Sequence, residues 1–548
     1  MALRSTSTLG FARRALCAGI AASFGLTVMA EPSGLVPVHG SASIGRDGKV
    51  TTVTTVNGAG GRSVLDWSGF GVGQGESVRF QQPDAASTSI NRVLGGNPSA
   101  IAGTLWSNGR LVLVNPAGIA VGAGAVVDTA GFTASTLGIS RDNAIAGRLL
   151  FGAGDLGEFR HNDGSLQVQG DGRILASGGD VVLIGRDIAT GSKALLQATG
   201  GDVVLAAGRT VEVTGRGLEG IRMQLRAPDD GAVNLGTLRG DSVAIFAGHL
   251  HHSGLVQARS AITVGGKVVL QATDKAEIEG RILATTAAKG GSVQLTADKL
   301  KLKSETVIDV SHAAGGGEIL VGGGLDGRDP RIANARDVEV DKGVLLRADA
   351  TLRGDGGTVV AWSNGEMDFR GRILARGAGG GAGGLVEVSA RGRIRFEGGV
   401  DVNGDGAKGG PAPDNDSGPG RSGDSGGPRD SGGPGSSGSG RGGGSDAGGD
   451  GGGSSGPTRG RVPIIPIAGQ STEVRSGAVG TASETADYLG KGSQLRDPSE
   501  DDFISLSQPA GSSADSDARV LGAGPQGGKG KRGKGGVVLT DAQCRAGS

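Results

Sequence analysis

Three histidines close together in the sequence are the first candidates for chemistry in this 548-residue chain: His249, His251 and His252. If the segment is extended, His249 and His251 share one face, where two imidazoles could ligate a metal or haem. No further block of Cys or His lies nearby, and a protein metal site normally needs three or four ligands. We therefore interpret these residues as exposed turn histidines and predict neither a metal site nor a bound cofactor.

A serine-nucleophile motif occurs at residues 423–428, which read Gly-Asp-Ser-Gly-Gly-Pro, as in trypsin-like proteases. The same letters partly repeat at residues 430–434, inside a tract of Gly, Ser, Asp and Pro. Catalysis needs a packed scaffold that holds an oxyanion hole and a histidine base, and no matching histidine block is present. We predict that the protein is not an enzyme.

A cell-attachment tripeptide, Arg-Gly-Asp, occurs twice, as Arg239-Gly240-Asp241 and Arg353-Gly354-Asp355. Presented on a turn, it could engage an integrin. In a chain rich in Arg, Gly and Asp, such tripeptides also arise by chance, because glycine and charged residues share turns. We favour the second interpretation.

The elements that position these residues are set by a repeat of paired glycines followed by aliphatic residues. Gly-Gly-Asp-Val-Val-Leu occurs at 178–183 and again at 200–205. Related blocks start at Gly265, Gly290, Gly316, Gly356 and Gly383, and the intervals that end at Gly265 and at Gly356 are much longer than the others. We interpret these two long intervals as three and two units of roughly 20–22 residues, a period typical of solenoid coils.

Alternation within the repeat indicates strands that must stack to bury one face. The pairs that share this face are Val181 with Leu183, Val203 with Leu205, Val268 with Leu270, and Val293 with Leu295. No stripe with helical spacing accompanies them, so an all-β parallel β-helix is predicted rather than a leucine-rich horseshoe. Residues 36–403 would form roughly 17–18 coils and a rod on the order of 80–90 Å, with a cap at each end.

Composition supports an elongated aliphatic solenoid and excludes several other classes. The chain has 111 Gly, 36% hydrophobic residues but only 3% aromatic residues, too few to fill the core of a compact globule. Its 55 basic and 55 acidic residues give no electrostatic reason to expect nucleic acid or anionic lipid as a partner. Residues 404–461 form a Gly/Ser/Asp/Pro linker, and residues 462–548 are a polar, Gly-rich tail; we predict that both are disordered.

The N-terminus reads as a secretory signal peptide over residues 1–30. Arg4, Arg13 and Arg14 precede an apolar run, and cleavage is predicted between Ala30 and Glu31. The longest later uncharged stretch, 111–127, is broken by Asn115-Pro116 and three glycines, so no integral membrane span is expected. Of the two cysteines, Cys17 lies in the signal and Cys544 is left as a lone thiol without a predicted role.

An ordered series of motifs fills residues 67–136. Its blocks are Trp67-Ser68-Gly69-Phe70-Gly71, Gln82-Pro83, Ile90-Asn91-Arg92-Val93, Gly95-Gly96-Asn97-Pro98, Gly103-Thr104-Leu105, Val114-Asn115-Pro116-Ala117-Gly118-Ile119 and Gly131-Phe132-Thr133-Ala134-Ser135. The series resembles the N-terminal secretion domain of filamentous-haemagglutinin-type exoproteins of two-partner secretion systems. We place this domain at residues 31–150, followed by a β-helix body at 151–403.

The resemblance implies a right-handed parallel β-helix and export of the unfolded chain through an outer-membrane β-barrel transporter with periplasmic recognition domains. It also implies a secretion motif made by Asn91, Arg92, Asn115, Pro116, Gly118 and Ile119. Asn-Pro-x-Gly suits a rigid β-turn between coils, so these residues either contact the transporter or only build the turn. Many relatives have Asn where Ala117 stands. Some relatives carry a second Asn-Pro motif earlier in the chain, and Asn97-Pro98 is the segment of this sequence that most resembles it.

The function predicted by the resemblance is that of a secreted or surface-held exoprotein of a Gram-negative bacterium, passing through the periplasm. Adhesion to an unidentified host-cell or bacterial ligand is the first hypothesis, and haem acquisition by an exoprotein of the same export class is the alternative. A delivered toxin would need a compact C-terminal domain, which residues 462–548 do not offer.

Overall fold

The computed structural model describes residues 31–159, 163–215, 221–224, 230–261 and 266–404, together with three short strands at 458–459, 473–474 and 503–505. The chain divides into two units, residues 1–507 and 508–548, and every described residue belongs to the first. The predicted signal peptide lies outside the described residues. The predicted linker and tail also lie outside them, apart from residue 404 and the three short strands.

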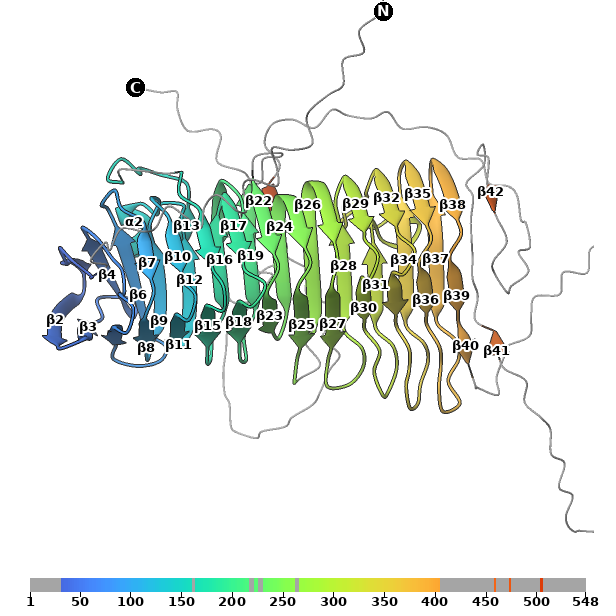
Figure 1. The fold of residues 1–548 in the computed structure, drawn as a ribbon, viewed down its shortest axis with the longest axis horizontal. Coiled ribbons are helices and arrows are strands. Elements are labelled where there is room, and N and C mark those ends of the chain that lie inside the picture. The colour runs from blue at the N-terminus through green and yellow to red at the C-terminus, as the bar shows by residue number, and fades with distance from the viewer. Residues whose placement is uncertain are drawn as a thin grey trace, which may run out of the picture. The chain divides into compact units, whose positions relative to one another are not determined.

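The described chain winds into a three-sided stack of parallel strands, which confirms the predicted β-helix (Figure 1). We name the sides the first, second and third face, in the order in which a coil visits them after the third-face strand β3. The first face contains β4 (Arg62–Trp67), β6 (Thr88–Val93), β9 (Arg110–Val114), β12 (Gly131–Ser135), β16 (Val181–Gly185), β19 (Val203–Ala207), the first halves of β24 (Val243–His252) and β26 (Lys267–Ile278), β28 (Ser292–Thr296), β31 (Glu318–Val321), β34 (Thr358–Ser363) and β37 (Leu385–Ala390).

The second face continues from the first around one corner of the coil. It contains β7 (Ser99–Ile101), β10 (Ile119–Val121), β14 (Leu166–Val168), β17 (Asp187–Thr190), β22 (Gly231–Asn234), the second halves of β24 and β26, β29 (Lys299–Leu302), β32 (Asp337–Val340), β35 (Glu366–Phe369) and β38 (Arg393–Phe396).

The third face is a separate sheet. It contains β3 (Val50–Val56), β5 (Ser77–Gln81), β8 (Thr104–Ser107), β11 (Val126–Thr129), β15 (Arg173–Ala176), β18 (Leu195–Ala198), β23 (Thr237–Gly240), β25 (Leu255–Arg259), β27 (Arg281–Thr285), β30 (Val307–Asp309), β33 (Leu345–Arg347), β36 (Arg372–Leu374) and β39 (Gly399–Asp401).

The core runs through the middle of the stack and consists of aliphatic columns, as the alternation predicts. Val181 pairs with Val203, which pairs with Val243, and all three are 0% exposed. Leu183 and Leu205 form the next inward column on the same strands. Each coil therefore offers the next one an apolar edge in register, and burial of these side chains holds neighbouring coils together.

A second apolar layer covers the outer side of the first face over the earlier coils. Here the residues between the inward columns, such as Val182 and Val204, are also buried, because α2 (Arg141–Ala146), β13 (Leu149–Phe151) and β20 (Thr210–Val213) pack over them. β13, β20 and β21 (Ile221–Gln224) form a small antiparallel sheet, to which β43 (Phe503–Ser505) adds an edge strand. This layer was not predicted.

The predicted coil number is wrong, because it counts excursions as coils and because several coils are longer than 20–22 residues, as the pairing of Arg372 with Gly399 shows. Thirteen parallel strands stack on the third face among the described residues, so the rod is on the order of 60 Å rather than 80–90 Å. Ile319 pairs directly with Val359, so the long interval that ends at Gly356 is one coil and not two. The long interval that ends at Gly265 likewise holds two coils and not three, since Val203 pairs with Val243 and Val243 with Val268.

The excursions all leave the coil at the same corner, between a first-face and a second-face strand. They carry α2 with β13, β20 with β21, and the short helix η3 (Leu325–Gly327). Because each excursion returns to the coil it left, the register of the stack is unbroken. Coils without an excursion also differ in length, from a short one in which Thr237 pairs with Leu255 to a longer one in which Arg372 pairs with Gly399.

The first coil is capped by antiparallel strands, as an exposed sheet edge requires. β2 (Ser41–Asp47) folds back on β3, and β1 (Val36–His39) runs antiparallel to β4. At the other end, β40 (Asn403–Gly404) pairs with β41 (Thr458–Arg459), and β38 pairs with β42 (Glu473–Val474).

Candidate functional site

The Asn115–Gly118 segment forms a closed turn between β9 and β10. The Gly118 N–H donates to the Asn115 carbonyl (2.9 Å), and the Asn115 side-chain Oδ1 accepts from the Ala117 N–H (3.0 Å). Gly118 has φ +126°, a backbone conformation that an L side chain rarely adopts. Pro116 fixes φ in the middle of the turn. The residue types therefore specify this turn, as the sequence predicts.

The turn is stacked on the Asn97-Pro98 segment of the preceding coil. Asn115 Nδ2 donates to the Asn97 carbonyl (3.0 Å) and to Ser99 Oγ (2.9 Å), and the Ser99 N–H donates to the Gly118 carbonyl (2.9 Å). Ile119 pairs with Ser99 and enters the core. Asn97-Pro98 thus occupies the same corner one coil earlier, with Pro98 beside Gly118 rather than beside Pro116.

Asn91 lies inside the core, in the inward column between Leu65 and Leu113. Its amide oxygen accepts from Trp67 Nε1 (3.0 Å), and its amide nitrogen donates to the carbonyl and the hydroxyl of Ser89 (both 3.1 Å). A buried amide is tolerated only with its partners in place. Asn91 therefore fixes how the Trp67 ring packs in the first coils.

The Arg92 side chain points to the outer side of the first face, where the layer formed by α2, β13 and β20 covers the strands, and it is 0% exposed. Its guanidinium pairs with Asp66 (3.2 Å) and with Glu158, and it lies 5.6 Å from the centre of the Phe159 ring. Burial raises the pKa of Asp66, Arg92 acts against that rise, and the pKa stays above its usual value. Arg92 thus ties the segment that follows β13 to the first face.

The predicted motif residues come from adjacent coils, because Asn91 and Arg92 pair with the two residues that directly precede the turn. All six, Asn91, Arg92, Asn115, Pro116, Gly118 and Ile119, are buried. In the folded protein they are structural, and their side chains are not presented to a partner. Glu31, on one side of the predicted cleavage point, pairs with Arg46 (3.5 Å), whereas Ala30 lies outside the described residues.

Replacing Asn115 by alanine is expected to destabilise the fold by about 2 kcal/mol, because three hydrogen bonds of this buried side chain disappear and the Asn97 carbonyl loses a donor. The measurement is urea unfolding of the full chain followed by tryptophan fluorescence. Ala117→Ser, at the partly exposed position of the same turn, is the control and should change stability little. Equal losses in the two variants would contradict the role given to Asn115.

A family model described as the TPS secretion domain matches residues 29–321. The chain belongs to this TPS secretion-domain family. The match confirms the resemblance to two-partner secretion exoproteins. It also runs past residue 150, where the motifs had placed the end of the domain, and into coils of the same stack.

Similar proteins come from Haemophilus influenzae. A heme/hemopexin-binding protein is 28% identical over 296 residues, which make up 50% of this chain and 31% of the relative. A second protein of the same name is 38% identical over 87 residues, which make up 16% of this chain and 9% of that relative. The crystal structure of the HMW1 secretion domain matches with a TM-score of 0.59 and 30% identity, covering 68% of this chain and 98% of that one. This TPS-domain chain therefore spans about a third of the first relative's length.

The two Arg-Gly-Asp tripeptides of the TPS-domain chain differ in their setting. Arg239-Gly240 ends strand β23, and Gly240 is buried, so this copy is part of a sheet and not a presented turn. Arg353 and Asp355 are exposed, and Gly354 between them has φ +95°. The second copy alone has the geometry of a presented turn, although the Asp355 carboxylate already accepts from the Ala382 N–H (2.8 Å).

The histidines lie on strand β24, so the interpretation as turn histidines is wrong. His249 and His251 share the outer side of the second face, where His249 Nε2 lies 2.5 Å from Asp274 and His251 Nδ1 lies 3.9 Å from Glu277. His252 points inward and is fully buried. Among the described residues, no group of three or more His, Cys, Asp or Glu side chains could hold a metal ion.

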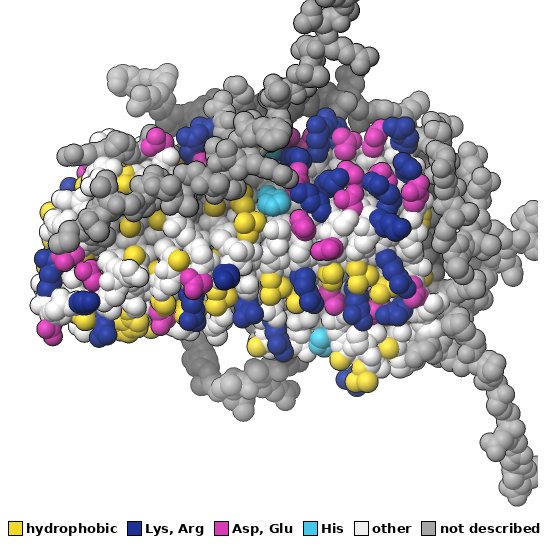
Figure 2. All heavy atoms as spheres, viewed as in Figure 1, with side chains coloured by type: hydrophobic (Ala, Val, Ile, Leu, Met, Phe, Trp, Pro, Cys, Tyr) yellow, Lys and Arg dark blue, Asp and Glu magenta, His cyan; other side chains and the backbone are white. Residues whose placement is uncertain are grey.

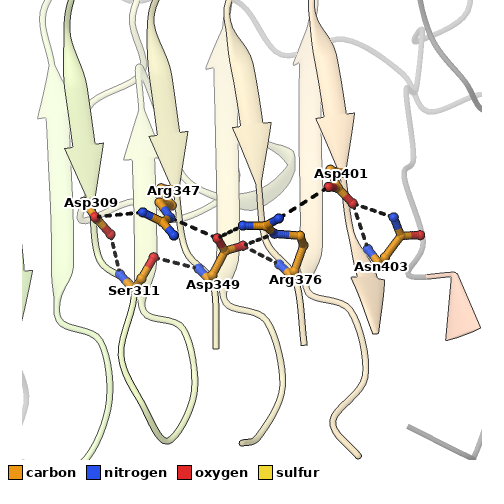
Figure 3. Close-up of polar contacts among 7 residues, drawn as sticks. All are labelled: Asp309, Ser311, Arg347, Asp349, Arg376, Asp401 and Asn403. Carbon is orange, nitrogen blue, oxygen red and sulfur yellow. Dashed lines mark hydrogen bonds and ion pairs between the residues drawn. The ribbon is translucent and has the colours of Figure 1, made fainter. Parts of the chain in front are cut away.

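A ladder of charged residues is centred on Asp349 on the third face (Figure 3). This ladder was not predicted from the sequence. The Asp349 side chain is 2% exposed and accepts from Arg347 (3.0 Å) and from the Arg376 guanidinium (2.7 Å) and backbone N–H (2.8 Å). Asp309 and Asp401 continue the ladder on either side. Burial alone would raise the pKa of Asp349, but the hydrogen bonds from Arg376 and Arg347 outweigh it and the pKa falls.

Replacing Asp349 by alanine is expected to cost about 2 kcal/mol, less than for a fully buried pair, because both arginines are more than a third exposed and can be rehydrated. A lowered carboxyl pKa stabilises the fold above the unfolded pKa, and this contribution disappears as the pH falls through the folded pKa. Urea unfolding should therefore separate wild type and variant at pH 7 and show them converging as the pH falls through the folded pKa of Asp349.

The control for this experiment is Asp309→Ala, which removes a more exposed carboxylate that accepts from the Ser311 backbone N–H (2.9 Å) and has one long ion-pair contact, to Arg347 (3.8 Å). It should change stability by less than about 0.5 kcal/mol. A pH-independent loss in Asp349→Ala would contradict the ion-pair explanation.

No helix among the described residues is long and apolar enough to span a membrane.

Proposed function

We propose that the chain is the exported partner of a two-partner secretion system. It crosses the outer membrane of a Gram-negative bacterium unfolded, through a β-barrel transporter with periplasmic recognition domains, and coils into the β-helix outside. Membership in the TPS secretion-domain family supports this proposal. So does the burial of Asn91, Arg92 and Asn115, since side chains hidden in the folded state can be read by a transporter only before folding.

The experiment is secretion of the full chain in a Gram-negative host, with and without a co-expressed outer-membrane transporter of a two-partner secretion system. The proposal predicts protein in the medium or on the surface only with the transporter, and periplasmic, protease-sensitive protein without it. Transporter-independent release would overturn it. An unrelated protein carrying the same signal peptide is the control for leakage of the outer membrane.

For the exported protein we propose two ligand classes. Haem or hemopexin capture is supported by the names of the two Haemophilus relatives and by His251, whose side chain is 36% exposed. Burial, with Lys303 nearby, lowers the pKa of His251, so at neutral pH its imidazole is uncharged, the form that binds haem iron. Adhesion is supported by the exposed Arg353-Gly354-Asp355 turn.

The two ligand classes are separated by two substitutions. Haem titration followed by absorbance should lose its signal in His251→Ala and keep it in Asp355→Ala. Attachment of integrin-bearing cells to immobilised protein should show the opposite dependence. Haem binding unchanged in His251→Ala would remove His251 as a ligand, and attachment unchanged in Asp355→Ala would remove the tripeptide.

A further inference from the structure

The charges on the outer side of the second face neutralise one another. Figure 2 shows basic and acidic side chains interspersed over the later coils. Apart from the exposed Lys299, the basic residues here lie within ion-pair distance of a carboxylate: Lys275, Lys301, Lys303, Arg370, Arg393 and Arg395. A balanced surface of this kind attracts neither cations nor anions strongly.

The third face differs over five consecutive strands, β15, β18, β23, β25 and β27. These strands carry four exposed arginines, Arg173, Arg239, Arg259 and Arg281, and no acidic residue. Among the described residues, none of the four side chains has an ion-pair or hydrogen-bond partner. The ion pairs of this face begin only with the Asp309–Asp349 ladder in the later coils.

Between the arginines, the outward positions hold partly exposed leucines. They are Leu175, Leu195, Leu255 and Leu283, with Gln197 and Gln257 in the same columns. Figure 2 shows hydrophobic and basic side chains side by side along this part of the molecule. We call the outward residues of β15, β18, β23, β25 and β27 the arginine–leucine strip.

We propose that the arginine–leucine strip binds the phosphate-bearing surface of a lipid membrane. Five parallel strands at about 4.8 Å spacing make a sheet surface roughly 20 Å long. Guanidinium groups pair with phosphate oxygens, and the leucines between them gain by contact with the acyl-chain boundary. Such binding would hold the exported rod along a membrane without a spanning segment.

The residue types favour a lipid surface over other anions. A soluble polyanion or an acidic peptide would match the arginines, but it would leave the leucines in water. Sugar rings and nucleic-acid bases are usually stacked on aromatic side chains, and the five strands contain none. The zero net charge of the chain is no objection, because the carboxylates next to the strip in its outward columns, Asp128 and Asp309, lie on the flanking strands β11 and β30 and none lies on the five strands themselves.

The test is co-sedimentation of the full chain with vesicles of phosphatidylcholine, with and without phosphatidylglycerol. We expect binding only to the anionic vesicles, weakening as salt screens the charges. Arg239→Gln/Arg259→Gln/Arg281→Gln should reduce the partition coefficient at least about tenfold. Leu255→Gln/Leu283→Gln should reduce it too, which a purely electrostatic contact would not.

The matched control is Lys275→Gln/Arg393→Gln/Arg395→Gln, which removes three ion-paired charges from the second face. It should bind anionic vesicles like the wild type, and circular dichroism should show that all variants keep their strands. Absent vesicle binding, equal binding to neutral vesicles, or equal loss in the control would overturn the proposal. So would retention on dextran sulfate without vesicle binding, which would instead indicate a soluble polyanion as the partner.

Discussion

Placing aspartate at Val181 is expected to stop the stack at that coil and to reduce release of the exported chain severalfold. Val181 is 0% exposed and lies in the inward column between Phe132 and Val203. A carboxylate there has no partner, and burying it costs about 4 kcal/mol or more. If folding outside the cell draws the chain outward, a coil that cannot close should let the chain slide back.

The measurement is a pulse–chase of the full chain in the presence of the transporter, scored as the extracellular fraction over time. Ser177→Asp introduces the same charge at an exposed position of the same coil, so it is the matched control. Equal release of both variants would show that folding does not drive export. Purified Val181→Asp should in addition lose hydrogen-exchange protection in β16 and β19.

How far the sequence determines this fold is shown by the same columns. Val181 and Leu183 alternate with a period of two, and the identical block at 200–205 fixes the register of one coil on the next. The Asn115 turn is equally local, since Asn, Pro and Gly specify its backbone geometry. Strands, stacking and turn could therefore be predicted.

Features that depend on where an excursion rejoins the stack, or on contacts between different coils, could not be predicted from these local patterns. A glycine pair marks the start of a strand but does not reveal whether the residues before it formed a coil or an excursion, so Gly316 and Gly356 gave the wrong count. Asp349 and Arg376 are far apart in the sequence and meet only because two coils stack. The covering layer adds burial that alternation does not report, as Arg92 illustrates.

His252 is another residue whose environment only the structure reveals, and it should make the fold acid-sensitive. Its Nδ1 lies 3.0 Å from Asn234 Nδ2, and Asn234 Oδ1 accepts from Thr190 (2.5 Å). Since an amide nitrogen can only donate, Nδ1 accepts and the proton is on Nε2. Burial, reinforced by the nearby His251, lowers the pKa of His252 to about 4.

The consequence for stability follows from linkage. Below the unfolded pKa of about 6.5 the unfolded chain takes up a proton that the folded chain refuses. The free energy of unfolding should therefore be unaffected by His252 above pH 6.5 and fall by about 3 kcal/mol between pH 6.5 and pH 4. Urea midpoints measured across this range should show the fall in the wild type, beginning well above the pH at which carboxylates titrate.

His252→Gln can still accept from Asn234 but carries no charge at any pH, so its stability should fall much less than that of the wild type from pH 6.5 to about pH 5. His251, whose pKa is also lowered, remains in this variant and accounts for the residual fall. His39→Gln, which removes an imidazole bonded to the Ala59 carbonyl far from this column, should keep the wild-type slope. If His252→Gln falls as steeply as the wild type, carboxylates rather than this imidazole set the acid limit. If it falls much less, the Thr190–Asn234–His252 column is the part of the core that acid opens first, and hydrogen exchange at pH 5 should be fastest in β17, β22 and β24.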